Sequence, residues 1–487
     1  MQAFAVSSAV RSTLPLLALA LLASPSTAQQ PAAPPARGDT LAVSIEDALG
    51  RALQQGDEVR VSEARRDAAA AQVGQARATG LPTLRLNGAF THVYENARAQ
   101  AVGQIFNQPN TYNLNLNLGV PLFQGGRVSA GLRSASRLRG AATADVEQAR
   151  QDVTLQVLRA YLDALLADRL VEIQQTNVRL AGERLRQVEQ MERAGRSSRY
   201  DVLRARVERS NLEPAAIQAA GDRELALLEL KRLANIPAGQ PLKLVSPVEA
   251  EAVSALAQQA AAETVNDSAS IASIPSVRAA EMRAQASRAG VTIARADYLP
   301  TLSFFVQSGW QAFPTSWSIP TRGGGLDTID CPAGSEVGRV CTRQNGGWFT
   351  DRSMGLQLSF PVFDGLRARS NVALARANAD VARAQAAQAR EAATVELAEA
   401  RTELARARAQ FDATRQNATE AEEAFRLATL RFQRGLSTQI DVSDAQLALA
   451  TARTNEARAT YELYLATAGL ARALGRPVPL PTGTTLR

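Results

Sequence analysis

Histidine and cysteine are almost absent from this chain, which holds one histidine and two cysteines among 487 residues. A single histidine, His92, excludes a zinc site built on several histidines and also a Ser-His-acid triad. No other convergent set of acid, base and nucleophile stands out in the sequence. We therefore predict that the protein is not an enzyme and that it needs no metal or cofactor.

Long hydrophobic runs are also missing. After the N-terminus, no stretch of about 18 apolar residues is present to form a transmembrane helix. The one apolar run, 14–23, follows Arg11 and precedes the small residues Ser-Thr-Ala at 26–28, which is the pattern of a secretory signal. We predict an exported chain with a signal peptide over 1–28 and a flexible linker over 29–40. No cysteine follows the run closely, so nothing marks a lipid attachment point.

The two cysteines, Cys331 and Cys341, lie in a stretch that is rich in glycine, proline and tryptophan. In an exported chain the oxidising compartment favours a disulfide over two free thiols, and a metal pair would lack a nearby histidine. We expect a disulfide between them that closes a loop and takes no part in chemistry.

Acidic residues are fewer than basic ones, and the formal net charge is +7. A pI near 9.9 raises the question of a nucleic-acid partner. The arginines, however, are scattered along helical stretches among glutamates and aspartates and do not cluster with aromatic residues. This distribution favours a solvated helix surface, and we predict no binding to nucleic acid.

Four motifs occur twice, in the same order, in the two halves of the chain. They are ARATGLPTL (76–84) and ARADYLPTL (294–302), LGVPLFQGGR (118–127) and LSFPVFDGLR (358–367), AGRSSRYDV from Ala194 and RGLSTQIDV from Arg434, and LKRLANIP and LARALGRP, which end at Pro237 and Pro477. The last three pairs are separated by 240 residues, so the long segments keep their length, as an internal repeat requires. We predict two structural repeats over 41–237 and 276–477, a linker with a short helix over 238–275, and a tail over 478–487.

The stretch YNLNLNLGV at 112–120 alternates apolar side chains with asparagine, which predicts a strand with one apolar and one polar face. Three other stretches show the same alternation. We predict four strands at about 82–94, 112–121, 300–311 and 352–362, with a long loop over 312–351.

Two kinds of sheet could use such strands. A soluble sandwich would bury the apolar faces against each other. Each repeat, however, offers only two strands, and their polar faces carry amides and hydroxyls, which favours a membrane barrel with a wet interior. Four strands cannot close a barrel in lipid, so several chains must share one. Two chains would give eight strands and an interior filled by side chains, whereas three would give twelve strands and a water-filled bore, which we prefer.

The segment Arg127–Arg193 contains no proline, and a helix of this size reaches on the order of 100 Å. The matching segment of the second repeat has apolar residues at every seventh position, with small residues in a companion column. The two columns are Leu397, Leu404, Phe411, Ala418, Phe425 and Phe432, and Ala393, Ala400, Ala407, Thr414, Ala421 and Ala428. This spacing predicts close helix packing of the coiled-coil type.

The paired motifs VPLFQGGR and FPVFDGLR, and GRSSRYDV and GLSTQIDV, together with the Leu-Pro-Thr-Leu entries and the signal peptide, resemble the TolC family of outer-membrane efflux channels. The resemblance covers about 40–477. It implies a mainly α-helical homotrimer with a shared twelve-stranded β-barrel, four strands per chain, in outer-membrane lipid of a Gram-negative bacterium. A long α-helical barrel would continue across the periplasm.

The resemblance also implies a function without bond chemistry. The trimer would be the passive exit duct of a tripartite efflux or type I secretion system. Its hairpin tips would dock on a periplasmic adaptor (membrane fusion) protein fed by an inner-membrane pump or ABC transporter. The residues do not distinguish drug, metal and protein cargo. The alternative is a periplasmic coiled-coil scaffolding protein whose strands form a soluble sheet.

The resemblance assigns residues to the two hairpin turns. The docking tip would contain Gly195, Gly435, Ser198 and Thr438. The pore constriction would contain Asp201, Asp441, Asp444, Phe432, Arg196 and Arg199, while Ser437 lacks the basic side chain sometimes found at its position. Ser198 and Thr438 also stand three residues before an aspartate, which predicts capping boxes at the return helices. For Asp201 and Asp441 both roles stay open, whereas capping does not require Asp444.

Aromatic residues make up only 5% of the chain. Tyr112, Trp310 and Trp348 are candidates for an aromatic girdle at the membrane surface, although each could equally pack under a loop. His92 stands near Tyr94 at a strand end, where an interfacial position is expected.

Overall fold

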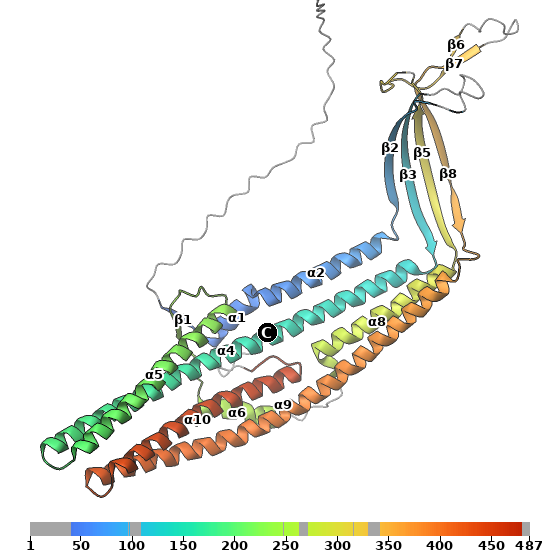
Figure 1. Cartoon of the computed structure of the whole chain (residues 1–487). Helices are drawn as coiled ribbons and strands as arrows, with labels where there is room; N and C mark the ends of the chain where they lie inside the picture. Colours follow the sequence, from blue (N-terminus) through green and yellow to red (C-terminus); the bar gives the residue numbers. More distant parts are fainter. Residues whose placement is uncertain are drawn as a thin grey trace, which may run out of the picture.

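The chain forms an elongated molecule with a sheet at one end and two helical hairpins at the other (Figure 1). The structure is a computed structural model, and it describes residues 40–95, 97, 109–246, 248–262, 271–314, 316–329 and 341–479. The helices are α1 (Ile45–Gln55), α2 (Asp57–Ala78), α4 (Arg127–Arg193), α5 (Arg199–Leu233), α6 (Ala250–Ala262), α8 (Pro275–Arg295), η2 (Ala296–Tyr298), α9 (Arg367–Gln433) and α10 (Gln439–Ala473). The strands are β1 (Leu41–Val43), β2 (Thr83–His92), β3 (Asn110–Gln124), β4 (Leu242–Leu244), β5 (Thr301–Ala312), β6 (Leu326–Ile329), β7 (Cys341–Gln344) and β8 (Trp348–Ser359).

Four antiparallel strands form the large sheet in the order β2-β3-β5-β8. Their register aligns apolar residues across the whole sheet, for example in the row Leu84, Leu118, Val306 and Met354. Because side chains alternate between faces, the neighbouring row falls on the other side, and it contains Arg85, Asn117, Gln307 and Ser353. The prediction of strands with one apolar and one polar face is confirmed.

The bounds of two strands, β3 and β8, differ from the prediction. β3 extends to Gln124, and a register shift between Pro121 and Phe123 lets the strand continue beyond the proline. β8 covers Trp348–Ser359, so it begins and ends a few residues before the predicted strand at about 352–362. Pro361 lacks the N–H that would continue the ladder, which accounts for the earlier end.

The predicted loop at 312–351 is not entirely a loop. β6 and β7 pair with each other inside it, and β8 begins before it ends. Cys331 lies outside the described residues, so the predicted disulfide with Cys341 falls outside them as well.

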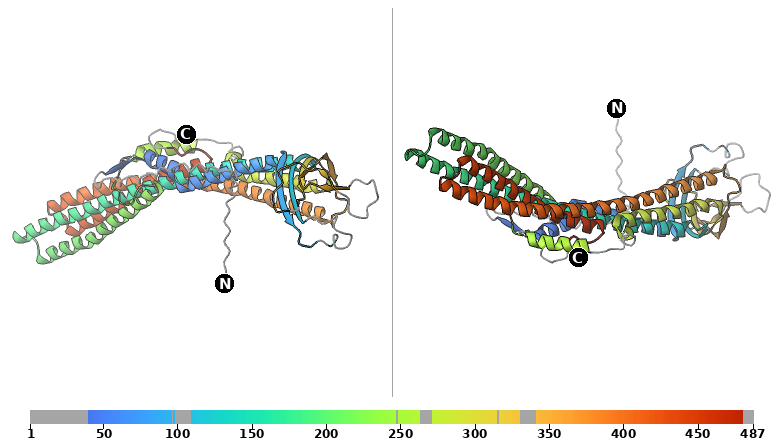
Figure 2. Two further views of the ribbon diagram at one scale, coloured as in Figure 1. Left: turned by 90° about the horizontal axis from the view of Figure 1, so that it is seen from above. Right: turned by 90° about the horizontal axis from the view of Figure 1, so that it is seen from below.

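The long helices come in two matched pairs. α4 and α9 each contain 67 residues, and α5 and α10 each contain 35. Among the heptad positions of α9, Leu397, Leu404, Phe411 and Ala418 are buried, and Phe425 and Phe432 towards the tip are half-buried. The predicted coiled-coil stripe is therefore confirmed. The hairpins α4–α5 and α9–α10 lie side by side (Figure 2), and α10 packs on α4.

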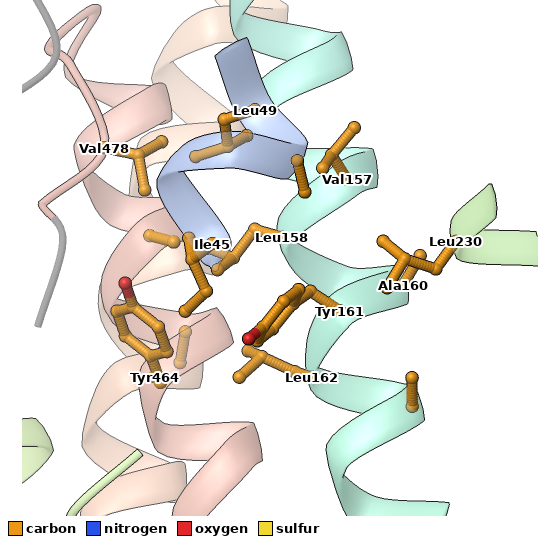
Figure 3. Close-up of a cluster of buried hydrophobic side chains, with 14 of the residues drawn as sticks. Ile45, Leu49, Val157, Leu158, Ala160, Tyr161, Leu162, Leu230, Tyr464 and Val478 are labelled. Carbon is orange, nitrogen blue, oxygen red and sulfur yellow. The ribbon is translucent and has the colours of Figure 1, made fainter. Parts of the chain in front are cut away.

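The main hydrophobic core lies midway along the molecule, where α1 packs between α4 and α10 (Figure 3). Tyr161 is fully buried there, and its hydroxyl donates to the carbonyl of Val43 (3.2 Å) and accepts from the N–H of Ser246 (3.1 Å). Tyr464 is also fully buried and donates to the carbonyl of Pro479 (3.0 Å). These bonds tie both ends of the described chain to the long helices. Among the helices that the structure describes, none is long and apolar enough to cross a membrane.

Candidate gate at the helical hairpin tips

Both hairpins turn on a glycine in the left-handed backbone region. Gly195 has φ +69° and Gly435 has φ +73°, and such angles suit glycine because it has no Cβ. In the first turn, the N–H of Arg196 donates to the carbonyl of Met191 (2.8 Å), which is the Schellman pattern at the end of a helix. Leu436 donates to Arg431 in the same way (2.8 Å). The two predicted tips therefore share one geometry.

Each return helix begins with a capping box, as the spacing predicted. The N–H of Ser198 donates to Oδ2 of Asp201 (2.9 Å), and the N–H of Asp201 donates to the hydroxyl of Ser198 (3.2 Å). Thr438 and Asp441 exchange the equivalent bonds, at 2.8 Å and 3.4 Å. Helix capping by both aspartates is confirmed.

The capping bonds favour the charged form of each aspartate. Hydrogen bonds from the side chain and backbone of Ser198, and from the side chain of Ser197, lower the pKa of Asp201. The backbone and side-chain bonds from Thr438 lower the pKa of Asp441. Both carboxylates are thus fixed as anions at the exposed ends of the hairpins.

The other residues assigned to the constriction lie around the same tips. Asp444 is exposed one helical turn beyond Asp441, and Phe432 is half-buried in the last turn of α9. Arg196 and Arg199 are exposed in the first hairpin, and within the described part of the chain neither forms an ion pair. At the tip, Asp201 is therefore hydrogen-bonded to Ser197 and Ser198, whereas the guanidinium groups of Arg196 and Arg199 are exposed.

A buried polar network joins the two hairpins, and sequence reasoning missed it. Arg184 on α4 is buried, and it donates to Glu208 (2.9 Å), to Ser443 (2.6 Å) and to Gln446 (2.5 Å). Burial lowers the pKa of Arg184, and the carboxylate of Glu208 opposes that shift. Gln446 also donates to the carbonyl of Asn177 (3.2 Å). The second hairpin is thus bonded to the first close to the tip.

A signal for this network is present in the sequence. Ala181, Leu185 and Val188 are buried on α4, and Arg184 falls among them at helical spacing. An arginine inside an otherwise apolar stripe indicates a buried charge that needs partners.

A groove of about 630 Å3 opens beside this network, between α5 and α10. Tyr200, Leu203 and Val207 line one wall, and Asp444 and Leu447 line the other. These apolar side chains are 49–69% exposed in a single chain. The groove therefore presents an uncovered apolar surface next to the aspartate of the tip.

Aromatic residues gather at the opposite end of the molecule, near the loops of the sheet. Tyr112 donates to the carbonyl of Trp317 (2.8 Å), and the indole of Trp348 donates to the carbonyl of Pro320 (2.8 Å). The ring of His92 stacks on Trp317 with centroids 4.6 Å apart. Tyr112 and Trp348 thus pack against the loop that follows β5. Packing under a loop was the alternative to a place in the aromatic girdle.

The third girdle candidate, Trp310, stands within the sheet opposite Leu114 and Thr350. Sequence reasoning missed Trp317, whose ring is central to this aromatic cluster. No group of three or more His, Cys, Asp or Glu side chains suited to a metal ion occurs within the described ranges.

Comparison with known proteins identifies the family. Residues 48–236 and 266–476 match the sequence profile of the family described as outer membrane efflux protein. The chain belongs to this family. Its members are outer-membrane channels and not enzymes, so the predicted family, the outer-membrane location and the non-enzymatic class are confirmed.

Relatives that are named for different roles match this outer membrane efflux protein about equally well. Nodulation protein T of Rhizobium leguminosarum is 25% identical over 412 residues, which are 84% of this chain and 80% of that protein. The cobalt-zinc-cadmium resistance protein CzcC of Cupriavidus metallidurans is 25% identical over 371 residues, 75% of this chain and 78% of that protein. The crystal structure of VceC from Vibrio cholerae has a TM-score of 0.70 at 20% identity, covering 89% of this chain and 96% of VceC, which shows the shared fold.

Proposed function

We propose that three copies of this chain close a twelve-stranded barrel in the outer membrane and form a passive exit duct. The observation that carries this proposal is the sheet with a single apolar face and two open edges. Among the described residues, β2 (10 residues) pairs on one side only, and β8 (12 residues) does so apart from an isolated bridge between Trp348 and Gly323. In hydrocarbon, unpaired N–H and C=O groups cost several kcal/mol each, so each edge needs a partner strand. Pairing β8 of one copy with β2 of the next satisfies both edges.

The exposure of the apolar face supports a lipid environment. Leu84, Leu86, Met354, Leu356 and Leu358 are each 64–77% exposed in a single chain. A surface of this kind is costly in water and favourable against acyl chains. The opposite face, with its asparagines and glutamines, would line a wet bore.

The helices support a periplasmic continuation of the duct. α9 begins 240 residues after α4, at Arg367 and Arg127, and α10 begins 240 residues after α5, at Gln439 and Arg199. This spacing, and the two stretches that match the family profile, favour a two-fold internal repeat over 41–237 and 276–477. Four long helices from each of three copies would form a helical barrel of twelve.

We further propose that the hairpin tips close the periplasmic end of the duct and dock on an adaptor protein coupled to an inner-membrane pump. Asp441 and Asp444 would constrict the pore, with Asp201, Phe432 and the exposed arginines of the first hairpin around them. The network of Arg184 supports this role, because it holds the second hairpin to the first beside these aspartates. The cargo class stays open, since the nodulation and metal-resistance relatives are equally similar.

Cross-linking between the edge strands tests the trimer. In a background with Cys331→Ser and Cys341→Ser, cysteines at Asn87 on β2 and Ser353 on β8 should form dimers and trimers on a non-reducing gel. Both positions lie on the polar face, so lipid does not shield them. Asn115 on the inner strand β3 replaces Asn87 in the control and should give no such ladder.

Planar bilayer recordings separate the duct from the alternative, a periplasmic scaffold. The purified assembly should form discrete channels and should need detergent to stay in solution. A protein that remains monomeric in buffer without detergent and never conducts would contradict the proposal.

A further inference from the structure

The helices that meet the sheet carry many arginines and few carboxylates over the turns nearest to it, with Asp297 and Asp364 standing at the junction itself. The stretches 68–82, 127–144, 282–296 and 365–379 hold eleven arginines and no aspartate or glutamate. The fold brings these distant stretches together, because α2 packs on α4, α4 on α8 and α8 on α9 beneath the sheet (Figures 1 and 2). The result is a basic collar at the junction of helices and strands. It is a local exception to the mixed charge seen along the rest of the helices.

A hollow in this collar lies between α8 and α9 and measures about 470 Å3. Arg295, Arg369 and Arg376 line it, together with Tyr298 and Leu299. All three arginines are exposed, and among the described residues none forms an ion pair. Three guanidinium groups around one hollow favour an anionic ligand with several oxygens, since guanidinium binds phosphate through paired N–H donors.

Two other arginines near this region do have carboxylate partners. Arg127 pairs with Asp297 close by, and Arg390, further down α9, pairs with Glu281 on α8 (2.5 Å). The same two helices thus provide ion pairs where carboxylates are present. At the hollow the positive charge is left without a protein partner among the described residues, so it is available to a ligand.

Large apolar side chains are exposed in the hollow and in the segment that precedes α9. Val362 is 90% exposed and Phe363 is 83% exposed, in the segment that joins β8 to α9. Tyr298 and Leu299, which line the hollow itself, are 50% and 43% exposed. Exposed aromatic and aliphatic groups beside basic ones are typical of a bilayer surface, where head groups meet acyl chains.

We propose that Arg295, Arg369 and Arg376 bind the phosphate of an anionic phospholipid in the leaflet that faces the periplasm. Tyr298 and Leu299 contact the glycerol and the first part of the acyl chains. Free phosphate shares the head-group chemistry, but it would gain nothing from the apolar wall of the hollow. The site depends on the proposed barrel, which places the end of the sheet at the membrane surface.

Native mass spectrometry of the purified full chain in detergent tests this site. The probes are phosphatidylglycerol, phosphatidylcholine with the same acyl chains, and inorganic phosphate. The test variant carries Arg295→Gln, Arg369→Gln and Arg376→Gln. The matched control carries Arg51→Gln, Arg186→Gln and Arg458→Gln, which remove the same charge from exposed positions without ion pairs among the described residues.

We expect wild type and control to bind phosphatidylglycerol roughly tenfold more tightly than phosphatidylcholine, and the test variant to lose most of this preference. A second variant with lysine at the three positions should keep part of the preference, because it keeps the charge. Equal preference in test variant and wild type would overturn the proposal. Displacement of phosphatidylglycerol by millimolar inorganic phosphate would instead identify a free-phosphate site.

The oligomeric mass and the bilayer conductance are recorded on the same samples. A trimer that conducts but shows no lipid preference would overturn the lipid site alone. A protein that forms neither trimers nor channels would overturn the proposed duct.

Discussion

The guanidinium of Arg184 donates a 2.5 Å hydrogen bond to the side-chain carbonyl of Gln446, from one helical hairpin to the other. Both side chains are buried, although each is polar. A buried polar group costs free energy unless it is paired, so this contact strongly restricts how the two hairpins can move apart.

Replacing Arg184 should therefore loosen the link between the hairpins. We expect Arg184→Met to lower the free energy of unfolding by about 2 kcal/mol, because it leaves Gln446 and Ser443 without their donor. The matched control is Arg179→Met, which removes an exposed pair with Glu183 on the same helix and should cost under about 0.5 kcal/mol. Denaturant titration of the purified assembly measures both. Equal losses of unfolding free energy in the two variants would show that the buried network stabilises the protein no more than an exposed ion pair does.

The glycine turns should resist substitution. Gly435→Ala should destabilise the hairpin by about 1 kcal/mol, because alanine is strained at φ +73° although the space around it is open. Gly221 in α5 has equally open space but a helical backbone, so Gly221→Ala should stabilise the protein by up to about 1 kcal/mol. We expect Gly435→Ala to lower the unfolding midpoint and Gly221→Ala to raise it. Changes in the same direction would contradict the turn geometry.

Charge at the proposed constriction can be removed without removing the cap. Asp441→Asn keeps an oxygen for the N–H of Thr438, so the pair Asp441→Asn and Asp444→Asn removes the charge and keeps a weaker, neutral cap. We expect a higher single-channel conductance and a weaker preference for cations. Asp441→Ala with Asp444→Ala should do the same and also loosen the start of α10. Bilayer recordings identical to wild type would remove these residues from the gate.

The caps should also respond to acid. Hydrogen bonds lower the pKa of Asp201 and Asp441 below the ordinary value of 3.8 in the folded chain. The stability that these two carboxylates contribute is therefore complete above the ordinary pKa of 3.8. It is lost as the pH falls through their lower pKa in the folded chain. A spin label at Arg434 should keep its mobility from pH 7 to about 4 and become more mobile below. With Asp201→Asn and Asp441→Asn the rise in spin-label mobility at low pH should disappear. A rise that persists in this variant would come from the protonation of other groups.

The two faces of the sheet predict opposite environments for neighbouring residues. A spin label at Leu114 should be accessible to oxygen dissolved in lipid, and one at Asn115 to a water-soluble nickel chelate. Leu114 faces Trp310 across the ladder, and Asn115 faces Gly309 on the other side. Equal accessibility at both positions would contradict a barrel in lipid.

Several features were predictable because a few neighbouring residues decide them. The alternation in 112–120 predicted the faces of β3, and the Ser-x-x-Asp and Thr-x-x-Asp spacings predicted both capping boxes. The end of β8 was predicted wrongly although its cause is also local. Apolar alternation continues through Phe360 and Val362, but the proline between them ends strand pairing.

The sequence by itself determined the period of each strand and helix, the glycine turns and the caps, since these depend on residues within one or two turns of one another. Only the tertiary structure decided which residues meet across the molecule. Arg184 and Gln446 are 262 positions apart, and the arginines of the collar come from four separate stretches. Such contacts depend on how the strands order the helices beneath them, and no local pattern of side chains contains that order.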